Sequence, residues 1–288
     1  PADKRLYALR DVTATVESIP LIAGSIMSKK LAEGIDGLVL DVKFGSGAFM
    51  NKIEDALELA KTLVAIGENF GKETIAYLTN MDQPLGHTIG NWLEVEESID
   101  ALKGEGPEDV VEVTHLLAGT MIYLGERAPS VEEGVGMSKK AVQSGQAWDK
   151  WLELVAEQGG NIKLLENPGN YAKAGHQFTI RAPESGYLQA IDAYAVGMAA
   201  LELGAGRRTK EDAIDPVAGV KLQKKVGDYV EKDETIAVRF TNNYYMIETA
   251  TELLTSALSI RAEAPAPVQM VAYRVDKTGV FELKDNDR

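Results

Sequence analysis

An apolar run, a glycine turn and an amphipathic helix follow one another between residues 37 and 78, and this order strongly constrains the fold. The run Gly37-Leu-Val-Leu-Asp-Val-Lys43 is almost continuously apolar, which is typical of a strand in a sheet covered on both faces. A glycine turn follows, then a helical pattern from Lys52 to Phe70 and a second buried strand from Lys72 to Leu78. Strands joined through a helix in this way run parallel. The sequence therefore predicts an α/β protein with a parallel sheet.

A helix is predicted from Pro20 to Glu33, just before the first strand, with Ser18 able to cap it and Gly34 able to end it. Four side chains spaced i, i+3, i+4 and i+7 share one stripe of this helix. They are Ile22, Ser25, Ile26 and Lys29. If this stripe is buried, the Lys29 ammonium needs an anionic partner or a ligand, because an unpaired buried charge is costly. A solvated surface lysine is the alternative.

The rest of the chain divides by its pattern into helices and then short strands. Helical patterns dominate up to residue 158, and Gly159 to Gly169 has the composition of a linker. Short strands around a helix from Ala193 to Leu203 follow, which indicates a separate C-terminal α+β subdomain. We expect three parts: residues 1–33 in a small helical domain, 34–165 in the α/β domain and 170–288 in the C-terminal subdomain.

Composition excludes several classes of function. The net charge of −14 argues against nucleic-acid binding, which needs a basic face. The chain has no cysteine, so disulfides, thiolate zinc sites and cysteine nucleophiles are excluded. No apolar run reaches the length of a membrane span and no signal peptide is visible, so cytoplasm is the default expectation.

Several motifs resemble the pyrimidine-nucleoside and thymidine phosphorylases. They are Leu6-Tyr-Ala-Leu-Arg-Asp-Val-Thr-Ala-Thr15, Ser18-Ile-Pro20, Ser28-Lys-Lys30, Asp41-Val-Lys43 and Gly45-Ser-Gly-Ala-Phe-Met50. The similarity extends to about Ile260. The loop Met81-Asp-Gln-Pro-Leu-Gly86 and the helix Leu93-Glu-Val-Glu-Glu-Ser-Ile99 look most like the broad-specificity bacterial members. The resemblance implies a pentosyltransferase that converts uridine, thymidine or deoxyuridine plus phosphate into free base and a pentose 1-phosphate.

The resemblance also implies which residues contact the pyrimidine base. Arg10 and Lys29 would donate to the ring carbonyls and stabilise the negative charge of the departing base, which makes them the catalytic candidates. Ser25 would pair with the ring N3–H, with Tyr7 alongside. Ile22, Ile26 and Phe49 would form the apolar walls of the base pocket.

A monovalent cation, K⁺, is the expected cofactor by the same resemblance, and no organic cofactor is expected. Its ligands here would be the main-chain carbonyls of Leu85 and Thr88 and the carboxylate of Glu97. Read alone, one glutamate near a glycine loop is rarely a metal site. Oxygen ligands of this kind do suit hard cations.

The chain opens on Pro1, and by the resemblance it would lack roughly the first third of the enzyme. The general acid and most phosphate-binding residues would then precede Pro1, so we expect this chain to carry the base-binding half and to be inactive alone. Family members are homodimers, so a homodimer is expected, with nucleoside and phosphate as the other partners.

Some features stay open to other interpretations. Asp41 and Lys43 are either part of the site or a structural ion pair. A phosphoribosyltransferase of the same fold is the rival enzyme. The segment from Gly219 to Thr235 resembles the hairpins of biotinyl and lipoyl carrier domains, so a barrel-sandwich-like C-terminal subdomain is expected, and a non-catalytic carrier or binding module is the rival outside the enzyme class. The segment has no lysine in the short context that carriers modify.

Overall fold

The computed structural model describes residues 18–209 and 211–283 of the chain. Contacts between residues group the chain into two compact units, each formed from separate stretches of sequence. Unit 1 takes the described residues of Pro1–Asn80, Val113–Ser138 and Gln269–Arg288, and unit 2 takes those of Met81–Glu112 and Lys139–Val268.

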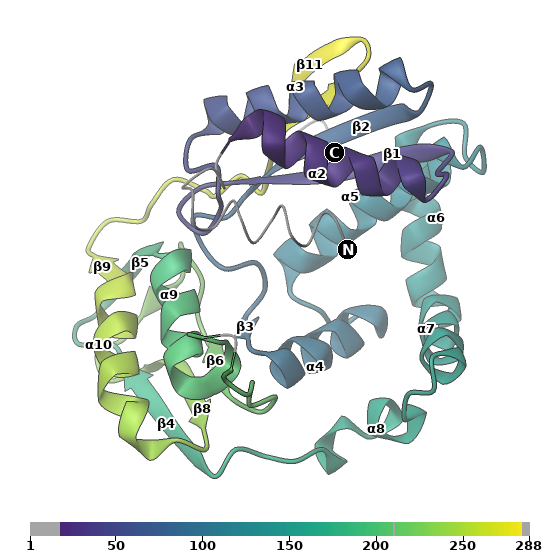
Figure 1. Cartoon of the computed structure of the whole chain (residues 1–288). Helices are drawn as coiled ribbons and strands as arrows, with labels where there is room; N and C mark the ends of the chain where they lie inside the picture. The colour runs from purple at the N-terminus through teal and green to yellow at the C-terminus, as the bar shows by residue number, and fades with distance from the viewer. Residues whose placement is uncertain (1–17, 210, 284–288) are drawn as a thin grey trace. The chain divides into compact units, whose positions relative to one another are not determined.

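A four-stranded sheet of order β1-β2-β10-β11 forms the centre of unit 1 (Figure 1). Strands β1 (Gly37–Phe44) and β2 (Glu73–Asn80) pair in parallel, as predicted, and helix α3 (Ile53–Asn69) connects them. Strands β10 (Val271–Asp276) and β11 (Gly279–Glu282) are antiparallel additions, β10 beside β2. The chain is thus α/β, but its sheet is mixed and not purely parallel.

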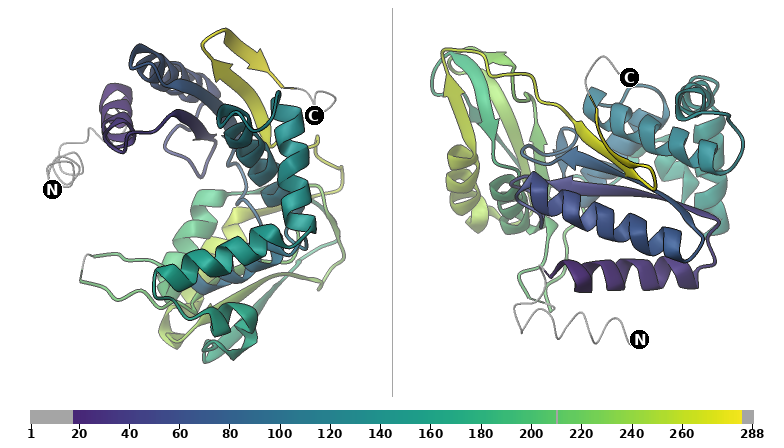
Figure 2. Two further views of the ribbon diagram at one scale, coloured as in Figure 1. Left: turned by 90° about the vertical axis from the view of Figure 1, so that its right-hand side faces the viewer. Right: turned by 90° about the horizontal axis from the view of Figure 1, so that it is seen from above.

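Helix α2 (Ile19–Ala32) runs beside α3, as the two views of Figure 2 show. Ser18 stands at its cap position, although its side chain makes no capping hydrogen bond to a described residue. Gly34 follows the helix with φ +72°, the left-handed conformation that commonly ends helices. The fully buried residues of α2 are Ala23 and Met27, which join the core under α3.

Helices α5 (Glu108–Leu124) and α6 (Val131–Gln143) contact each other through glycines. A Cβ built on Gly134 would lie 2.2 Å from the carbonyl oxygen of Gly119, and one built on Gly119 would lie 2.4 Å from the Val135 nitrogen. Only residues without a side chain allow two backbones to approach this closely. The sequence pattern therefore fixes this crossing point between the helices.

Unit 2 contains two antiparallel sheets around an apolar core. The first has the order β3-β6-β8-β4 and the second β7-β5-β9, and helices α9 and α10 pack together beside them. The strands are β3 (Thr88–Ile89), β4 (His176–Arg181), β5 (Gly186–Ile191), β6 (Gly219–Leu222), β7 (Tyr229–Val230), β8 (Thr235–Thr241) and β9 (Leu258–Arg261). The helices are α4 (Asn91–Leu102), α7 (Gln146–Glu157), α8 (Ile162–Glu166), α9 (Ala193–Ala200) and α10 (Ile247–Ala257), with short turns at η1 (Pro168–Asn170), η2 (Leu201–Ala205) and η3 (Tyr244–Met246).

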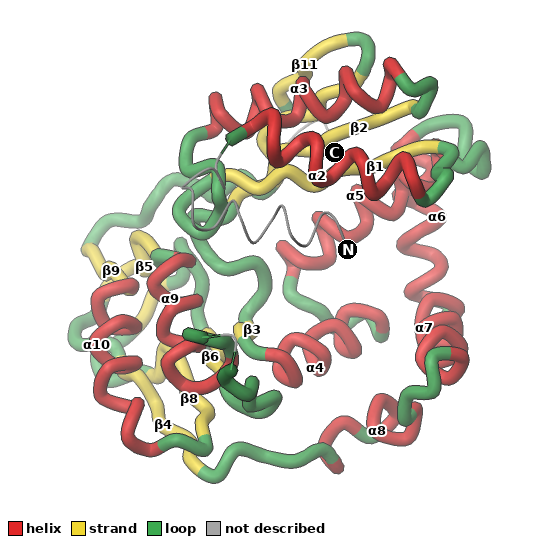
Figure 3. Tube along the Cα trace, viewed as in Figure 1, coloured by secondary structure: helices red, strands yellow, loops and turns green. Residues whose placement is uncertain are grey.

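Two details of the chain differ from the pattern-based expectation. The stretch expected to be a plain linker contains the short helix α8, which appears as a helical tube in Figure 3. Strand β10, from the stretch expected in the C-terminal subdomain, pairs with β2 in unit 1. The division of the chain into residues 1–33, 34–165 and 170–288 stays a prediction.

Candidate functional site

Helix α2 carries the described part of the predicted base-binding set. Tyr7 and Arg10 lie outside the described residues. Lys29 and Ser25 are one helical turn apart, and the Lys29 ammonium donates to the Ser25 hydroxyl over 3.3 Å. This contact holds a cation and a hydroxyl next to each other at the surface of unit 1, and both groups can donate to the carbonyl oxygens of a ring.

The face of α2 that is buried is not the predicted stripe. Lys29 is exposed and Ser25, Ile22 and Ile26 are half-buried, because Ala23 and Met27 occupy the fully buried side. Ile22 and Ile26 still pack against the core of unit 1 with part of their surface. The condition under which Lys29 would need an anionic partner, a buried stripe, is therefore not met, and the alternative of an exposed lysine describes this side chain.

Phe49 lies in the turn that follows β1 and is 68 % exposed. The turn is held by the Gly45 amide, which donates to the Met50 carbonyl over 3.1 Å, with Gly45 at φ +110°. Phe49 is outside the apolar cluster that Ile22 and Ile26 join. The structure thus brings Ser25 together with Lys29, and it leaves Phe49 exposed in the turn after β1.

A polar cluster stands where the parallel strands β1 and β2 end. The Lys43 ammonium lies 2.5 Å from the Asp41 carboxylate and donates to the Thr79 hydroxyl over 2.9 Å. The Thr79 hydroxyl in turn donates to Asp41. Lys43 and Thr79 are register partners, which explains why they meet. Carboxyl ends of parallel strands are where α/β proteins place ligands. Thr79 is the member of this cluster that sequence reasoning missed, since only strand pairing shows it.

The loop before α4 holds the residues predicted to bind a cation. The Glu97 carboxylate accepts a hydrogen bond from the His87 amide over 2.8 Å. A Cβ on Gly86, which has φ +72°, would lie only 2.1 Å from Oε2 of Glu97, so the carboxylate packs directly on the loop backbone. Burial raises the pKa of Glu97 above its usual value, and the His87 amide partly offsets that rise.

The oxygen groups near Glu97 fit a hard cation. The hydroxyl of Thr88 is buried beside the Glu97 carboxylate, whose pKa it helps to lower, although the two make no hydrogen bond of ordinary geometry. The Leu85 carbonyl likewise accepts no hydrogen bond from residues 18–209 and 211–283. Among these residues there is no group of three or more histidine, aspartate or glutamate side chains that could hold a metal. A cation here would thus depend on one carboxylate and on main-chain oxygens.

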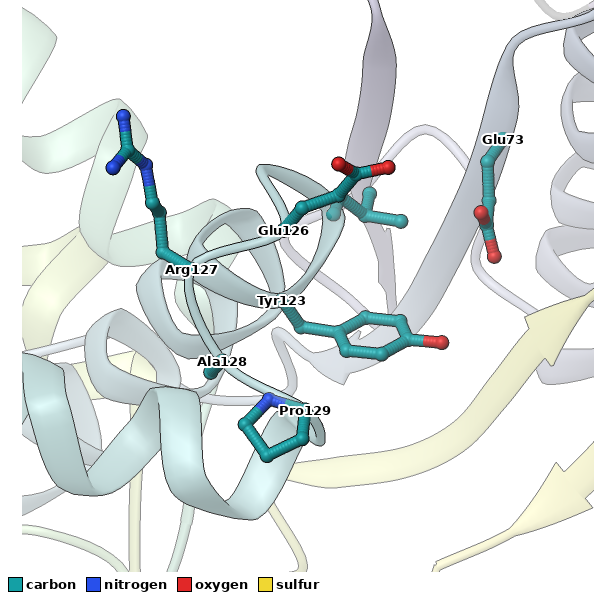
Figure 4. A pocket seen from close by; sticks show the side chains of 7 residues that line it. Glu73, Tyr123, Glu126, Arg127, Ala128 and Pro129 are labelled. Carbon is teal, nitrogen blue, oxygen red and sulfur yellow. The ribbon is translucent and has the colours of Figure 1, made fainter.

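Three cavities lined by described residues lie within single units, and the two larger ones are described here. In unit 2, a cavity of about 870 Å³ is lined by Thr88, Glu97 and His87, among others, and Trp92 and Tyr171 stack in its wall with ring centroids 3.8 Å apart. In unit 1, a cavity of about 520 Å³ lies at the opposite end of β2 from Thr79 (Figure 4). The second cavity is lined by Glu73, Tyr123, Leu124, Glu126, Arg127, Ala128 and Pro129, none of which was predicted to bind substrate.

The helices that the structure describes include none that is both long enough and apolar enough to cross a membrane.

Comparison with known proteins gives two family matches. Residues 1–148 match the family model described as glycosyl transferase family, a/b domain, and residues 187–261 match pyrimidine nucleoside phosphorylase C-terminal domain. The chain is 48% identical over 267 residues to the pyrimidine-nucleoside phosphorylase of Bacillus subtilis (strain 168), covering 93% of this chain and 61% of that protein. It is 49% identical over 277 residues to the protein of the same name from Geobacillus stearothermophilus, covering 96% and 63%. The chain thus spans about three fifths of the length of these relatives.

Proposed function

Because this chain belongs to the glycosyl transferase family through its a/b domain, we propose that it carries the base-binding part of a pyrimidine-nucleoside phosphorylase. The reaction is the reversible phosphorolysis of uridine, thymidine or deoxyuridine to free base and ribose or deoxyribose 1-phosphate. The observation that carries the proposal is the pair of family matches together with 45–49% identity to relatives named for this activity.

The described residues support a role in holding the leaving base. As the bond to C1′ breaks, negative charge moves onto the ring nitrogen and the carbonyl oxygens. Lys29 and Arg10 would stabilise that charge, which is greater in the transition state than in the bound nucleoside. Ser25, held 3.3 Å from the Lys29 ammonium, would accept from or donate to the ring edge. Tyr7, Ile22, Ile26 and Phe49 would complete the base pocket.

A K⁺ ion is proposed at the carbonyls of Leu85 and Thr88 and the carboxylate of Glu97. When bound, such an ion supplies fixed positive charge that orders oxygen-rich loops. The residues of this chain hold the loop: the Glu97 carboxylate binds the His87 amide and packs on Gly86. No organic cofactor is proposed. A homodimeric, cytoplasmic enzyme is the proposed assembly and location.

The test is an assay of uridine phosphorolysis. The chain alone should release no uracil from uridine and phosphate. Joined to the part of the Geobacillus stearothermophilus enzyme that it does not match, it should release uracil and ribose 1-phosphate, detected by chromatography. If that chimera folds and binds phosphate but cleaves no pyrimidine nucleoside, the proposed activity is wrong.

A further inference from the structure

The ammonium of Lys225 lies among three oxygens in unit 2. It donates to the Gly86 carbonyl over 2.7 Å, lies 2.9 Å from the Asp109 carboxylate, and also donates to the Pro84 carbonyl. The Lys225 side chain is only 15% exposed and that of Asp109 13%. An ammonium has three N–H donors, so these three acceptors satisfy it fully. Lys225 is therefore committed to internal contacts.

Lys225 lies in the segment from Gly219 to Thr235, which resembles a carrier hairpin. Its contacts indicate that this segment binds the loop before α4. A carrier lysine must be exposed at a hairpin tip to be modified. The neighbouring Lys224 also has a partner, since its ammonium lies 2.8 Å from the Glu234 carboxylate. Neither lysine of the Lys224–Lys225 pair is thus presented for modification.

The residues around Lys225 bind the same loop through further hydrogen bonds. The Val226 amide donates to the Gln83 side chain over 3.1 Å, and the Leu222 amide donates to the His87 carbonyl over 2.7 Å. Asp109, which neutralises Lys225, also accepts from the Gly86 amide over 3.1 Å. Residues 222–226 thus engage the loop at positions 83, 84, 86 and 87, but not at Leu85.

We propose that Lys225 is a positioning residue, whose ammonium fixes the Pro84 and Gly86 carbonyls so that the intervening Leu85 carbonyl and the Glu97 carboxylate are held ready for a monovalent cation. The inference rests on the cation site of the proposed function. The Lys225 ammonium binds the Pro84 and Gly86 carbonyls. The Leu85 carbonyl and the Glu97 carboxylate are then left for the dissolved monovalent cation. Glu97 reaches the loop at Gly86, the residue whose carbonyl Lys225 holds.

Three variants of the 288-residue chain separate positioning from simple stability, and a fourth, Lys225→Ala, allows chemical rescue. Lys225→Met keeps the length of the side chain and removes its charge. Val226→Ala removes an apolar contact with the core of unit 2 at the next residue and leaves the ammonium in place. Lys232→Met removes the same charge from an exposed lysine of the same stretch of chain.

The first measurement is amide hydrogen exchange in peptides that cover residues 83–90. Lys225→Met should raise the exchange rate there at least tenfold, because Asp109 and the loop carbonyls are no longer held by the ammonium and the Gly86 and His87 amides then separate more often from Asp109 and Glu97. In Lys225→Ala, n-propylammonium should restore protection, since it replaces the missing carbons and the ammonium, whereas tetramethylammonium, which has no N–H, should not. Unchanged exchange in Lys225→Met would overturn the proposal.

The second measurement is the rise in melting temperature as KCl replaces choline chloride at constant total salt, because a cation that binds only the folded state stabilises it. The KCl midpoint should rise at least tenfold in Lys225→Met and stay within twofold of the parent chain in the other two variants. Equal shifts of the KCl midpoint in Lys225→Met and Val226→Ala would contradict the proposal, because Lys225 would then contribute only to stability. A parent chain without any response to KCl would also overturn the inference, while uridine phosphorolysis by the chimera would still decide the proposed activity independently.

Discussion

Helix α2 and the loop before α4 carry the two candidate binding regions, and they differ in how the fold holds their polar groups. On α2, the Lys29 side chain is exposed, and its ammonium donates a hydrogen bond of 3.3 Å to the hydroxyl of Ser25, four residues earlier on the same helix. In the loop, backbone groups of Pro84, Gly86 and His87 are bound by side chains and strands from elsewhere in unit 2. The first region depends on side chains at a surface, and the second on a fixed backbone.

This difference predicts how function and stability are coupled in each region. An exposed side chain can be removed from α2 at little cost to folding, because surface substitutions away from special contacts change stability by less than about 0.5 kcal/mol. A change in the loop disturbs hydrogen bonds that hold several segments together. In the loop, function and stability should therefore change together, whereas on α2 they should separate.

Lys29→Ala gives the largest expected effect and tests the α2 side of the comparison. In the chimera, kcat/KM for uridine should fall about a hundredfold or more, because a cationic donor to the departing base is lost. The melting temperature should stay unchanged. Lys30→Ala is the matched control, since Lys30 is the adjacent residue and its ammonium lies 3.1 Å from Glu33. If Lys29→Ala retains normal turnover, or if both variants lose it equally, Lys29 does not contact the base.

Gly86→Ala tests the loop side. The added Cβ would meet Oε2 of Glu97 at 2.1 Å, and φ +72° would strain the backbone. Gly104→Ala is the control, because Gly104 has φ +85° but its Cβ would meet only Val142, at 3.9 Å. We expect Gly104→Ala to cost about 1–2 kcal/mol from strain alone, and Gly86→Ala about 1–3 kcal/mol more from overpacking.

Urea unfolding at neutral pH measures both glycine variants. Equal losses would mean that Glu97 moves away from Gly86 without cost, and the loop would then be as adaptable as the surface of α2. A larger loss in Gly86→Ala, together with a weaker response to KCl, would support the coupling of stability and cation binding in the loop.

The sequence allowed prediction of features that depend on local patterns. The helices, the parallel pair β1 and β2, and the loop before α4 follow from apolar periodicity and from glycine and proline positions. The buried face of α2 could not be predicted, because this helix carries apolar residues on more than one face. Ala23 and Met27 form as suitable an apolar stripe as Ile22 and Ile26. A pattern that fits two faces cannot choose between them without knowledge of the packing partner.

Contacts between distant stretches of chain could not be predicted either. Strand β10 pairs with β2 although the two are far apart in the sequence. The residues of β10 do not indicate which strand it will pair with. Thr79 joins Asp41 and Lys43 only through strand register, and Lys225 meets Asp109 only through the fold of unit 2. The resemblance to a known family supplied the residues expected to contact ligands, but it did not supply Thr79 or Lys225.

Tyr77→Phe has the smallest expected effect. Whereas Lys29→Ala should change activity and leave stability unchanged, Tyr77→Phe should change only the free energy of unfolding. The buried Tyr77 hydroxyl lies 2.9 Å from the Thr120 hydroxyl, which itself donates to the Leu116 carbonyl over 2.8 Å, so Tyr77 is the donor of the pair. In Tyr77→Phe, Thr120 still has an acceptor for its proton. The free energy of unfolding at neutral pH should therefore fall by only about 0.5–1.5 kcal/mol, with no change in base binding.

The pH dependence of this variant gives a second readout. Burial raises the pKa of Tyr77 above its usual value of 10.0, and the hydrogen bond with Thr120 only partly offsets that. Above pH 10 the unfolded chain therefore releases the Tyr77 proton while the folded chain retains it. The unfolded state then binds fewer protons, so the stability contributed by Tyr77 falls as the pH rises.

Urea unfolding at neutral and alkaline pH should show the parent chain losing more stability than Tyr77→Phe, since all other tyrosines are common to both. If the two proteins lose stability in parallel, Tyr77 ionises in the folded state as easily as in the unfolded one.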